Sequence, residues 1–189
     1  MAQTQPEATY ADYLAAAATS EVKLEFAGGE ILAMSVGTLA HATIIANVSA
    51  ALHGAVHGSG CRVLSSDARV RRDDEDFAAY PDATVVCGPP ETHADDPDGL
   101  VNPALVVEVL FPSTEAWDRG GTFAHYRRIE SLREVVFVRQ DARHVEVHRR
   151  NEAGRFELFE FRDDEAVELG SVGVSIPMDA VYDGVVPPA

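Results

Sequence analysis

The segment 104–111 constrains the fold of this chain more than any other stretch. It reads Ala-Leu-Val-Val-Glu-Val-Leu-Phe, so apolar side chains occupy both faces of the strand that it predicts. A strand with two apolar faces belongs in the middle of a sheet that is covered on both sides, because each face must be removed from water. Pro112 ends the strand, and Ser113 or Thr114 can cap a helix that continues to about Ile129. This order predicts an α/β fold.

Two carboxylates lie in runs that otherwise indicate buried strands: Glu108 in this segment, and Asp82 in the run 80–87. Burying an ionised carboxylate is costly unless it is paired, hydrogen-bonded or bound to a metal. Neighbouring strands lie about 4.8 Å apart, so two carboxylates at equal height can share one divalent cation. Hard oxygen ligands of this kind favour Mg²⁺ or Mn²⁺. The alternative is that both carboxylates are buried partners of arginines or backbone amides.

The rest of the chain supplies the other layers of such a fold. Helices are expected over 9–18 and 38–57, a hairpin over 22–34 around Gly28-Gly29, and a long solvated loop over 88–103. Further strands are expected within 62–70 and over 80–87, 135–138, 144–148, 156–161 and 166–169. Gly120-Gly121 should leave the first half of the helix after Pro112 frayed or loop-like.

The helix over 38–57 carries an apolar stripe made by Ile45, Val48, Leu52 and Val56. His41 lies on the same stripe at the first turn of this helix. It should therefore face inward, near one end of the sheet on which the helix packs. From spacing alone, the alternative is a histidine at the core edge that is hydrogen-bonded to the backbone.

Length and composition limit the classes of function. The 189 residues predict one domain with a core over about 20–170 and loosely held termini. No apolar run is long enough to span a membrane and the start of the chain is polar, so we expect a cytoplasmic protein with no membrane partner. Cys61 and Cys87 have no metal or redox spacing and should be reduced and buried.

The net charge of −16 weakens any expectation of non-specific binding to a polyanion, because phosphate neutralisation needs Lys and Arg. Lys23 is the only lysine. Local clusters of arginine occur at positions 69–72, 127–128 and 149–150, and a local patch can act even on an acidic protein.

Several motifs together resemble the Uma2 endonuclease family, a branch of the PD-(D/E)XK restriction-endonuclease-like superfamily. They are Tyr80-Pro81-Asp82, the run 105–110 with Pro112-Ser113-Thr114, and Asp118-Arg119-Gly120 leading to His125-Tyr126-Arg127. Upstream, Glu25 with Gly29-Glu30-Ile31, and His41 before Asn47, are similar to the family's N-terminal pattern. The resemblance covers about residues 10–185. It implies a restriction-endonuclease-like mixed sheet flanked by helices, with an N-terminal hairpin.

The resemblance also implies a Mg²⁺- or Mn²⁺-dependent DNA endonuclease with Asp82 and Glu108 as metal ligands. The backbone carbonyl of Val109 would be the third ligand. The superfamily usually places a lysine two residues after the glutamate, where this chain has Leu110. The Uma2 pattern moves that lysine into the following helix, at the position that Thr122 occupies here.

The remaining candidates support this site. Arg119 can replace the missing lysine, since a guanidinium suits phosphate geometry. His41 gains weight as a residue that orders water or orients Glu108. Glu25 and Asp67 stay open between a role at the site and a solvated carboxylate.

The leading interpretation is therefore a metal-dependent DNA endonuclease, impaired by Thr122 at the lysine position. The alternative is a degenerate nuclease fold that acts as a binding or interaction module, which the missing lysine and the negative charge favour. A hydrolase of a smaller phosphodiester would tolerate the acidic surface but has no motif of its own. A homodimer is expected only because two-fold dimers are the commonest assembly.

Overall fold

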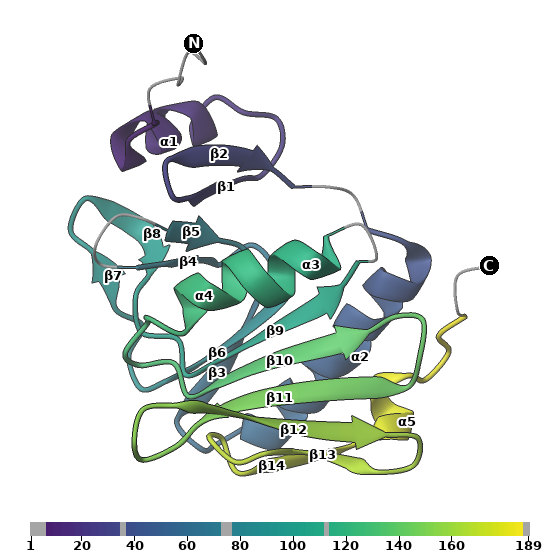
Figure 1. The fold of residues 1–189 in the computed structure, drawn as a ribbon. Coiled ribbons are helices and arrows are strands. Elements are labelled where there is room, and N and C mark those ends of the chain that lie inside the picture. The colour runs from purple at the N-terminus through teal and green to yellow at the C-terminus, as the bar shows by residue number, and fades with distance from the viewer. Residues whose placement is uncertain (1–6, 35–36, 73–76, 112–113, 187–189) are drawn as a thin grey trace.

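A six-stranded mixed sheet with β9 in its interior organises the computed structural model, which describes residues 7–34, 37–72, 77–111 and 114–186 (Figure 1). The strand order is β12-β11-β10-β9-β6-β3. These strands are β3 (Cys61–Ser65), β6 (Ala83–Cys87), β9 (Leu105–Leu110), β10 (Glu134–Arg139), β11 (His144–Arg150) and β12 (Phe156–Arg162). Strand β9 runs parallel to β10 and antiparallel to β6. The predicted central position of the segment 104–111 is confirmed.

Both faces of this sheet are covered, as the two apolar faces of β9 require. On one face, Val107 and Val109 pack with α2 (Leu39–Val56), the hairpin of β13 (Ala166–Leu169) and β14 (Val174–Pro177), and α5 (Met178–Val181). On the other face, Val106 and Leu110 pack with the helical segment that follows β9. Helix α2 is long and apolar enough to cross a membrane, but its buried face lies in this core. That face uses Ile44 rather than the predicted Ile45, which is only partly buried.

A second six-stranded sheet stands above the central one in Figure 1, in the order β2-β1-β5-β4-β8-β7. Its strands are β1 (Leu24–Ala27), β2 (Glu30–Ala33), β4 (Arg69–Arg71), β5 (Phe77–Ala79), β7 (Thr92–His93) and β8 (Asp96–Leu100). The predicted glycine hairpin is the β1–β2 pair, with positive φ at Gly28 and Gly29. Helix α1 (Tyr10–Ala17) covers this sheet through Tyr10, Tyr13 and Phe26.

The segment 88–103 is not the solvated loop that its composition predicts, because it contains β7 and β8. Asp96 explains the difference, since its side chain is only 2% exposed. Its carboxylate accepts a hydrogen bond from the Tyr10 hydroxyl at 2.6 Å and forms an ion pair with Arg69. These buried contacts of Asp96 stabilise part of an acidic segment as a strand, and no local sequence pattern predicts such long-range partners.

The segment 115–126 is helical throughout, instead of frayed at its glycines. It consists of α3 (Glu115–Trp117), the π-helical turn η1 (Asp118–Thr122) and α4 (Phe123–Tyr126). Gly121 lies against the indole of Trp117, where a Cβ atom would come within 2.8 Å of the ring. The glycine therefore allows close packing here. The predicted cap at Ser113 lies outside the described residues, as does Pro112.

Two further expectations fail in this structure. Cys61 and Cys87 form a disulfide and are not the reduced, buried pair that was expected, because β3 and β6 place them directly opposite one another. The C-terminal segment is held more firmly than expected as far as Tyr182, which is 8% exposed. Its hydroxyl donates to the carbonyl of Arg139 at 2.7 Å. Sequence spacing gives neither contact.

The packing of α2 yields a test with a matched control on the same helix. Leu52 is 0% exposed in the core, whereas Leu39 is 89% exposed. Leu52→Ala should lower the free energy of unfolding by about 2–5 kcal/mol, because it removes buried methyl groups and leaves a cavity. Leu39→Ala should change it by less than about 0.5 kcal/mol. Urea denaturation followed by circular dichroism measures both. Equal losses would contradict the placement of α2.

Candidate active-site cleft

A cleft of about 460 Å³ opens where the β1–β2 hairpin, the first turn of α2, the start of β6, the end of β9 and the α3–η1 segment meet. Its described lining residues are Glu25, Glu30, Leu32, Ala33, Met34, Gly37, His41, Tyr80, Asp82, Glu108, Val109, Phe111, Thr114, Trp117, Asp118 and Thr122. The cleft therefore gathers most of the residues that the sequence singles out.

Strand register places the two central carboxylates together. Ala83 of β6 and Val107 of β9 form the last pair of this ladder, and Asp82 and Glu108 are the next residues of the two segments. Asp82 itself directly precedes β6, not inside the strand as expected, since Pro81 before it has no N–H to continue the ladder. Its Oδ2 instead accepts a hydrogen bond from the backbone N–H of Val109 at 2.7 Å.

His41 is the second partner of Asp82. Its Nε2 lies 3.3 Å from Asp82 Oδ2, and the imidazole also hydrogen-bonds the backbone of Val109. Burial opposes the charged imidazolium, but the hydrogen bond and the charge of Asp82 outweigh it and raise the pKa of His41. His41 therefore stands beside two of the groups predicted as metal ligands, and it contacts Asp82 where the sequence interpretation had it orient Glu108.

Tyr126 of α4 orients Glu108. Its hydroxyl donates to Glu108 Oε1 at 2.6 Å from the helix that covers this face of the sheet. Burial, and then the charge of Asp82, raise the pKa of the Glu108 carboxyl well above its ordinary value. A carboxyl in this setting is stable either as the neutral acid or beside a positive charge.

Two more carboxylates enter the cleft from other elements. Glu25 Oε1 accepts the backbone N–H of Tyr80 at 3.1 Å, and burial raises the pKa of Glu25 to about 7, helped by Asp118 and Asp82. Asp118 of η1 accepts the hydroxyl of Thr114 at 2.9 Å, and burial together with Asp82 raises its pKa as well. These carboxyl groups raise one another's pKa, so they share one electrostatic site.

This site has a deficit of positive charge. Five carboxylates line it, while its described lining residues include no lysine or arginine. Negative charges that destabilise one another in a partly buried space are relieved by protons or by a cation. The donors are all hard oxygens, so the residues fit Mg²⁺ or Mn²⁺ in chemical type.

The basic residues considered for this site lie elsewhere. Arg119 forms ion pairs with Glu115 at 2.8 Å and with Glu146, and it is not among the cleft residues. Lys23 pairs with Asp67 at 2.7 Å, which also accounts for Asp67 as an exposed partner. Thr122 does reach the cleft wall, with 6% of its surface exposed. Thr122, where the resemblance leads us to expect a lysine, thus lines the cleft without a charge.

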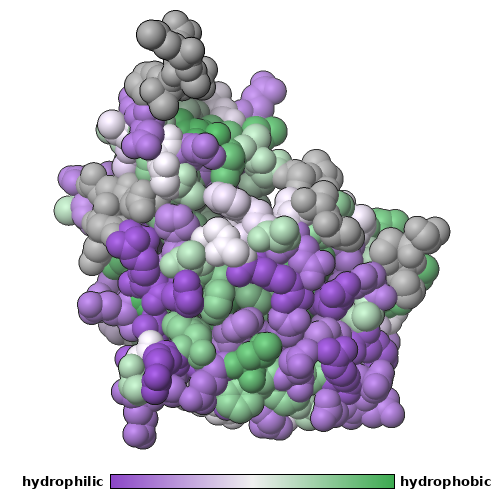
Figure 2. Space-filling view, in the orientation of Figure 1, coloured by the Kyte–Doolittle hydropathy of each residue, from purple (hydrophilic) through white to green (hydrophobic). Residues whose placement is uncertain are grey.

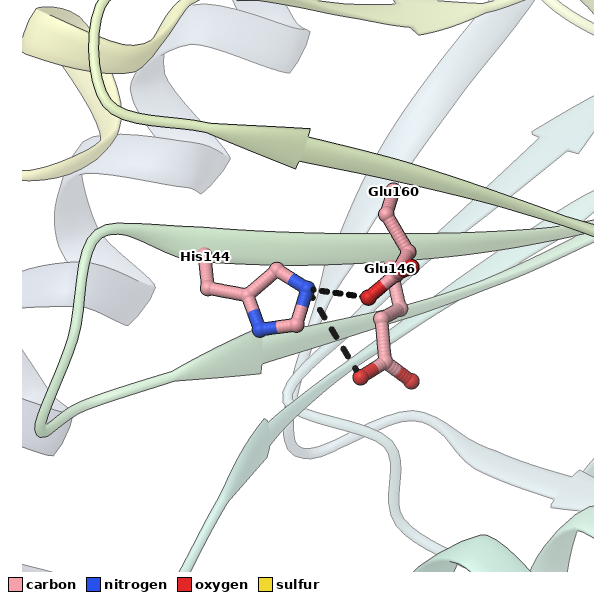
Figure 3. Close-up of side chains that lie close together, drawn as sticks. All are labelled: His144, Glu146 and Glu160. Carbon is pink, nitrogen blue, oxygen red and sulfur yellow. Dashed lines mark hydrogen bonds and ion pairs between the residues drawn. The ribbon is translucent and has the colours of Figure 1, made fainter.

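A second group of titratable side chains lies on β11 and β12 (Figure 3). His144 Nε2 is 3.0 Å from Glu160 Oε1 and 3.8 Å from Glu146 Oε1. Among the described residues this is the only set of three His, Cys, Asp or Glu side chains whose ligand atoms all lie within 4.8 Å of one another. Arg119 already pairs with Glu146 and Arg162 with Glu160, so the cluster is a balanced ionic network.

Sequence reasoning missed the roles of Asp118, which lines the cleft, and of Tyr126, which is buried behind it against Glu108. Both stand inside the quoted motifs, Asp118-Arg119-Gly120 and His125-Tyr126-Arg127. Those motifs were the available signal, but only the packing of α4 on β9 shows that Tyr126 faces Glu108.

Comparisons with known proteins agree with this architecture. Residues 10–179 match the Uma2 family, described as "Putative restriction endonuclease". An uncharacterized protein of Synechocystis sp. is 29% identical over 179 residues, which cover 95% of this chain and 93% of that protein. A second uncharacterized Synechocystis protein is 28% identical over 138 residues, covering 73% and 78%.

A solved structure has the same fold. The crystal structure of "a putative nuclease belonging to DUF820" from Anabaena variabilis superposes with a TM-score of 0.77 at 16% identity. The match covers 94% of this chain and 99% of that one. The restriction-endonuclease-like fold expected from the sequence is confirmed.

The carboxyl group of Glu25 makes stability depend on pH in a defined direction. Its pKa is about 7 in the folded chain against an ordinary 4.5, so between these values the folded state holds a proton that the unfolded state has released. The free energy of unfolding should therefore fall as pH rises from about 4.5 to 7. In Glu25→Gln that fall should be smaller, by up to about 3 kcal/mol.

Urea denaturation at pH 5 and pH 8 in the presence of EDTA measures this difference. Glu21→Gln removes an exposed glutamate just before the same hairpin and should keep the wild-type pH dependence. An identical pH dependence in wild type and Glu25→Gln would show that Glu25 is not held in a destabilising environment.

Proposed function

We propose, since the chain belongs to the Uma2 family, that it is a metal-dependent DNA endonuclease of the PD-(D/E)XK type. The observation that carries this proposal is the opposed pair Asp82 and Glu108, set in a cleft whose described lining is acidic and without lysine or arginine. Phosphodiester hydrolysis in such a site needs a divalent cation to offset this charge before a phosphate can approach.

Asp82, Glu108 and the backbone carbonyl of Val109 would hold the cation. Asp82 and Glu108 directly follow the last pair of the β6–β9 ladder, Ala83 with Val107, and Val109 follows Glu108 on the same strand. Mg²⁺ commonly keeps several waters and takes only one or two carboxylates from the protein, so a pair of this kind suffices. When bound, the cation would polarise a phosphoryl oxygen and lower the pKa of a nearby water.

The residues around these ligands have supporting roles in this proposal. Tyr126 fixes the carboxylate of Glu108, and the N–H of Val109 fixes that of Asp82. The carboxylate of Asp82 raises the pKa of His41 and so favours its protonated form, whereas a cation bound at Asp82 would disfavour that form. Glu25 lines the same cleft, and its pKa of about 7 suits a group that exchanges a proton with water near neutral pH.

The uncharged side chain of Thr122 sets the expected rate. Loss of one electrostatic contact to a transition state typically costs about 2.7–4 kcal/mol, or about 10²–10³ in rate. Arg119 is engaged with Glu115 and Glu146, so it does not supply the charge. We therefore expect slow cleavage. The second candidate, a degenerate nuclease fold that only binds, rests on the same missing charge.

Plasmid nicking tests the metal site. Purified protein with Mg²⁺ or Mn²⁺ should convert supercoiled plasmid to the nicked form, while Asp82→Asn and Glu108→Gln should lower the rate at least about 100-fold, because each removes a ligand charge. Glu157→Gln, an exposed glutamate on β12, is the matched control and should cleave like wild type. Equal rates in all four proteins would mean that these carboxylates do not act.

The lysine position gives an independent prediction. Thr122→Lys should raise the nicking rate by about 10-fold or more, because it brings a positive charge to the cleft wall. Thr122→Met has a similar length without the charge and should give no increase. Kinetics of plasmid nicking compare the three proteins.

These variants also separate the two candidate functions. Inert wild type, gain of cleavage in Thr122→Lys and Mg²⁺ binding by calorimetry would establish the degenerate fold. If Thr122→Lys stays inert and calorimetry detects no binding of Mg²⁺ or Mn²⁺, the proposed site is wrong.

A further inference from the structure

A second concavity of about 690 Å³, here called the arginine groove, lies between the C-terminal end of α4 and the turn from β11 to β12. Its described lining residues are Phe123, Ala124, His125, Arg127, Arg128, Gly154, Arg155 and Phe156. Three arginines and a histidine line it and no Asp or Glu does, in a chain whose net charge is −16. Two segments far apart in the sequence thus combine into one basic surface.

The arginines of this groove are exposed and two of them are not neutralised. Arg127, Arg128 and Arg155 are all exposed. Within the described part of the chain, neither Arg127 nor Arg155 forms an ion pair with a carboxylate, whereas Arg119, Arg139, Arg143 and Arg162 all do. Their positive charge is therefore available to an anion from solution.

The floor of the groove is aromatic. The rings of Phe123 and Phe156 meet edge to face with centroids 5.7 Å apart, and the Arg127 guanidinium lies 5.2 Å from the Phe123 ring. In Figure 2, hydrophilic side chains gather around the position of α4 with apolar surface between them. Exposed cations beside aromatic rings suit a nucleic-acid strand, because its phosphates bind positive charge and its sugars and bases pack on apolar or aromatic side chains.

The arginine groove adjoins the acidic cleft along one helical segment. Asp118 and Thr122 line the cleft, and Phe123, the next residue, already lines the groove. The two sites therefore adjoin one another at consecutive residues of this segment.

We infer that the arginine groove binds the phosphate backbone of the DNA that the cleft carboxylates cleave. The cleft repels a polyanion, so affinity for DNA must come from another surface, and guanidinium groups suit phosphate oxygens. This inference deepens the proposed function and rests on it for the nature of the ligand. It assigns binding to Arg127 and Arg155 on one surface, and chemistry to Asp82 and Glu108 on another.

The test measures binding without cleavage. Fluorescence anisotropy follows a labelled 20-base-pair duplex and, separately, a 20-nucleotide single strand, each titrated with protein at 50–200 mM NaCl. All variants carry Asp82→Asn, so that DNA is not cut. Adding Arg127→Ala with Arg155→Ala should weaken binding of at least one probe about tenfold at 100 mM salt. It should also reduce the slope of log affinity against log salt by about 1.4–1.8, the effect of two lost phosphate contacts.

Two controls make the result specific. Arg143→Ala with Arg162→Ala removes the same charge from arginines paired with Asp179 and Glu160, and should leave the affinity within about twofold. Arg127→Lys with Arg155→Lys keeps the charge and should retain most of the salt slope. Circular dichroism verifies that each variant is folded.

The outcomes separate this inference from the proposed function. The inference would be overturned if Arg127→Ala with Arg155→Ala lowered the affinity for DNA no more than Arg143→Ala with Arg162→Ala. It would also be overturned if the Asp82→Asn protein bound neither probe. Groove-dependent binding by a chain that never nicks plasmid would support the groove and contradict the nuclease proposal. Preference for the duplex or for the single strand tells which form of DNA the groove fits.

Discussion

The hydrogen bond from the backbone N–H of Val109 to the carboxylate of Asp82, 2.7 Å long, fixes the geometry on which the site depends. It joins the start of β6 to β9 at the point where the ladder would place Asp82 opposite Glu108. A strand with two apolar faces can carry a carboxylate only at such an opening in the packing. There α2 begins on one side and the α3–η1–α4 segment begins on the other. The fold and the site therefore share one origin, the register of these two strands.

In the proposed function, the distribution of charge assigns different tasks to the two surfaces. Carboxyl groups of Glu25, Glu108 and Asp118 have raised pKa values because they are buried near one another and near Asp82. The cleft thus holds more negative charge than it can stabilise alone, which favours a cation. The groove on the next helical turn carries exposed arginines. In this proposal an acidic chain binds DNA through the basic groove and cleaves it in the neighbouring acidic cleft.

Turn residues and hydrophobic periodicity in the sequence predicted the elements that depend on neighbouring residues alone. The glycine hairpin, helix α2 and the central strand β9 follow from turn chemistry and periodicity. Asp82 and Glu108 stand out because a charge interrupts an apolar run, and their role as metal ligands stays a prediction. The sequence could not reveal contacts that only the packed fold creates. Tyr126 reaches Glu108 from a different element, Asp96 draws part of a loop into the second sheet, and Cys61 meets Cys87 through strand register. The ion pair between Arg119 and Glu146 is likewise a long-range contact, so the sequence could not show that Arg119 is engaged there and not at a phosphate.

If Asp82 and Glu108 hold a divalent cation, anomalous scattering from a crystal grown with Mn²⁺ will locate it without reference to activity. We expect a peak between Asp82 and Glu108, within about 2.0–2.6 Å of a carboxylate oxygen of each. A peak only at His144, Glu146 and Glu160, or a cleft without anomalous signal in crystals saturated with Mn²⁺, would show that the two carboxylates do not form a metal site.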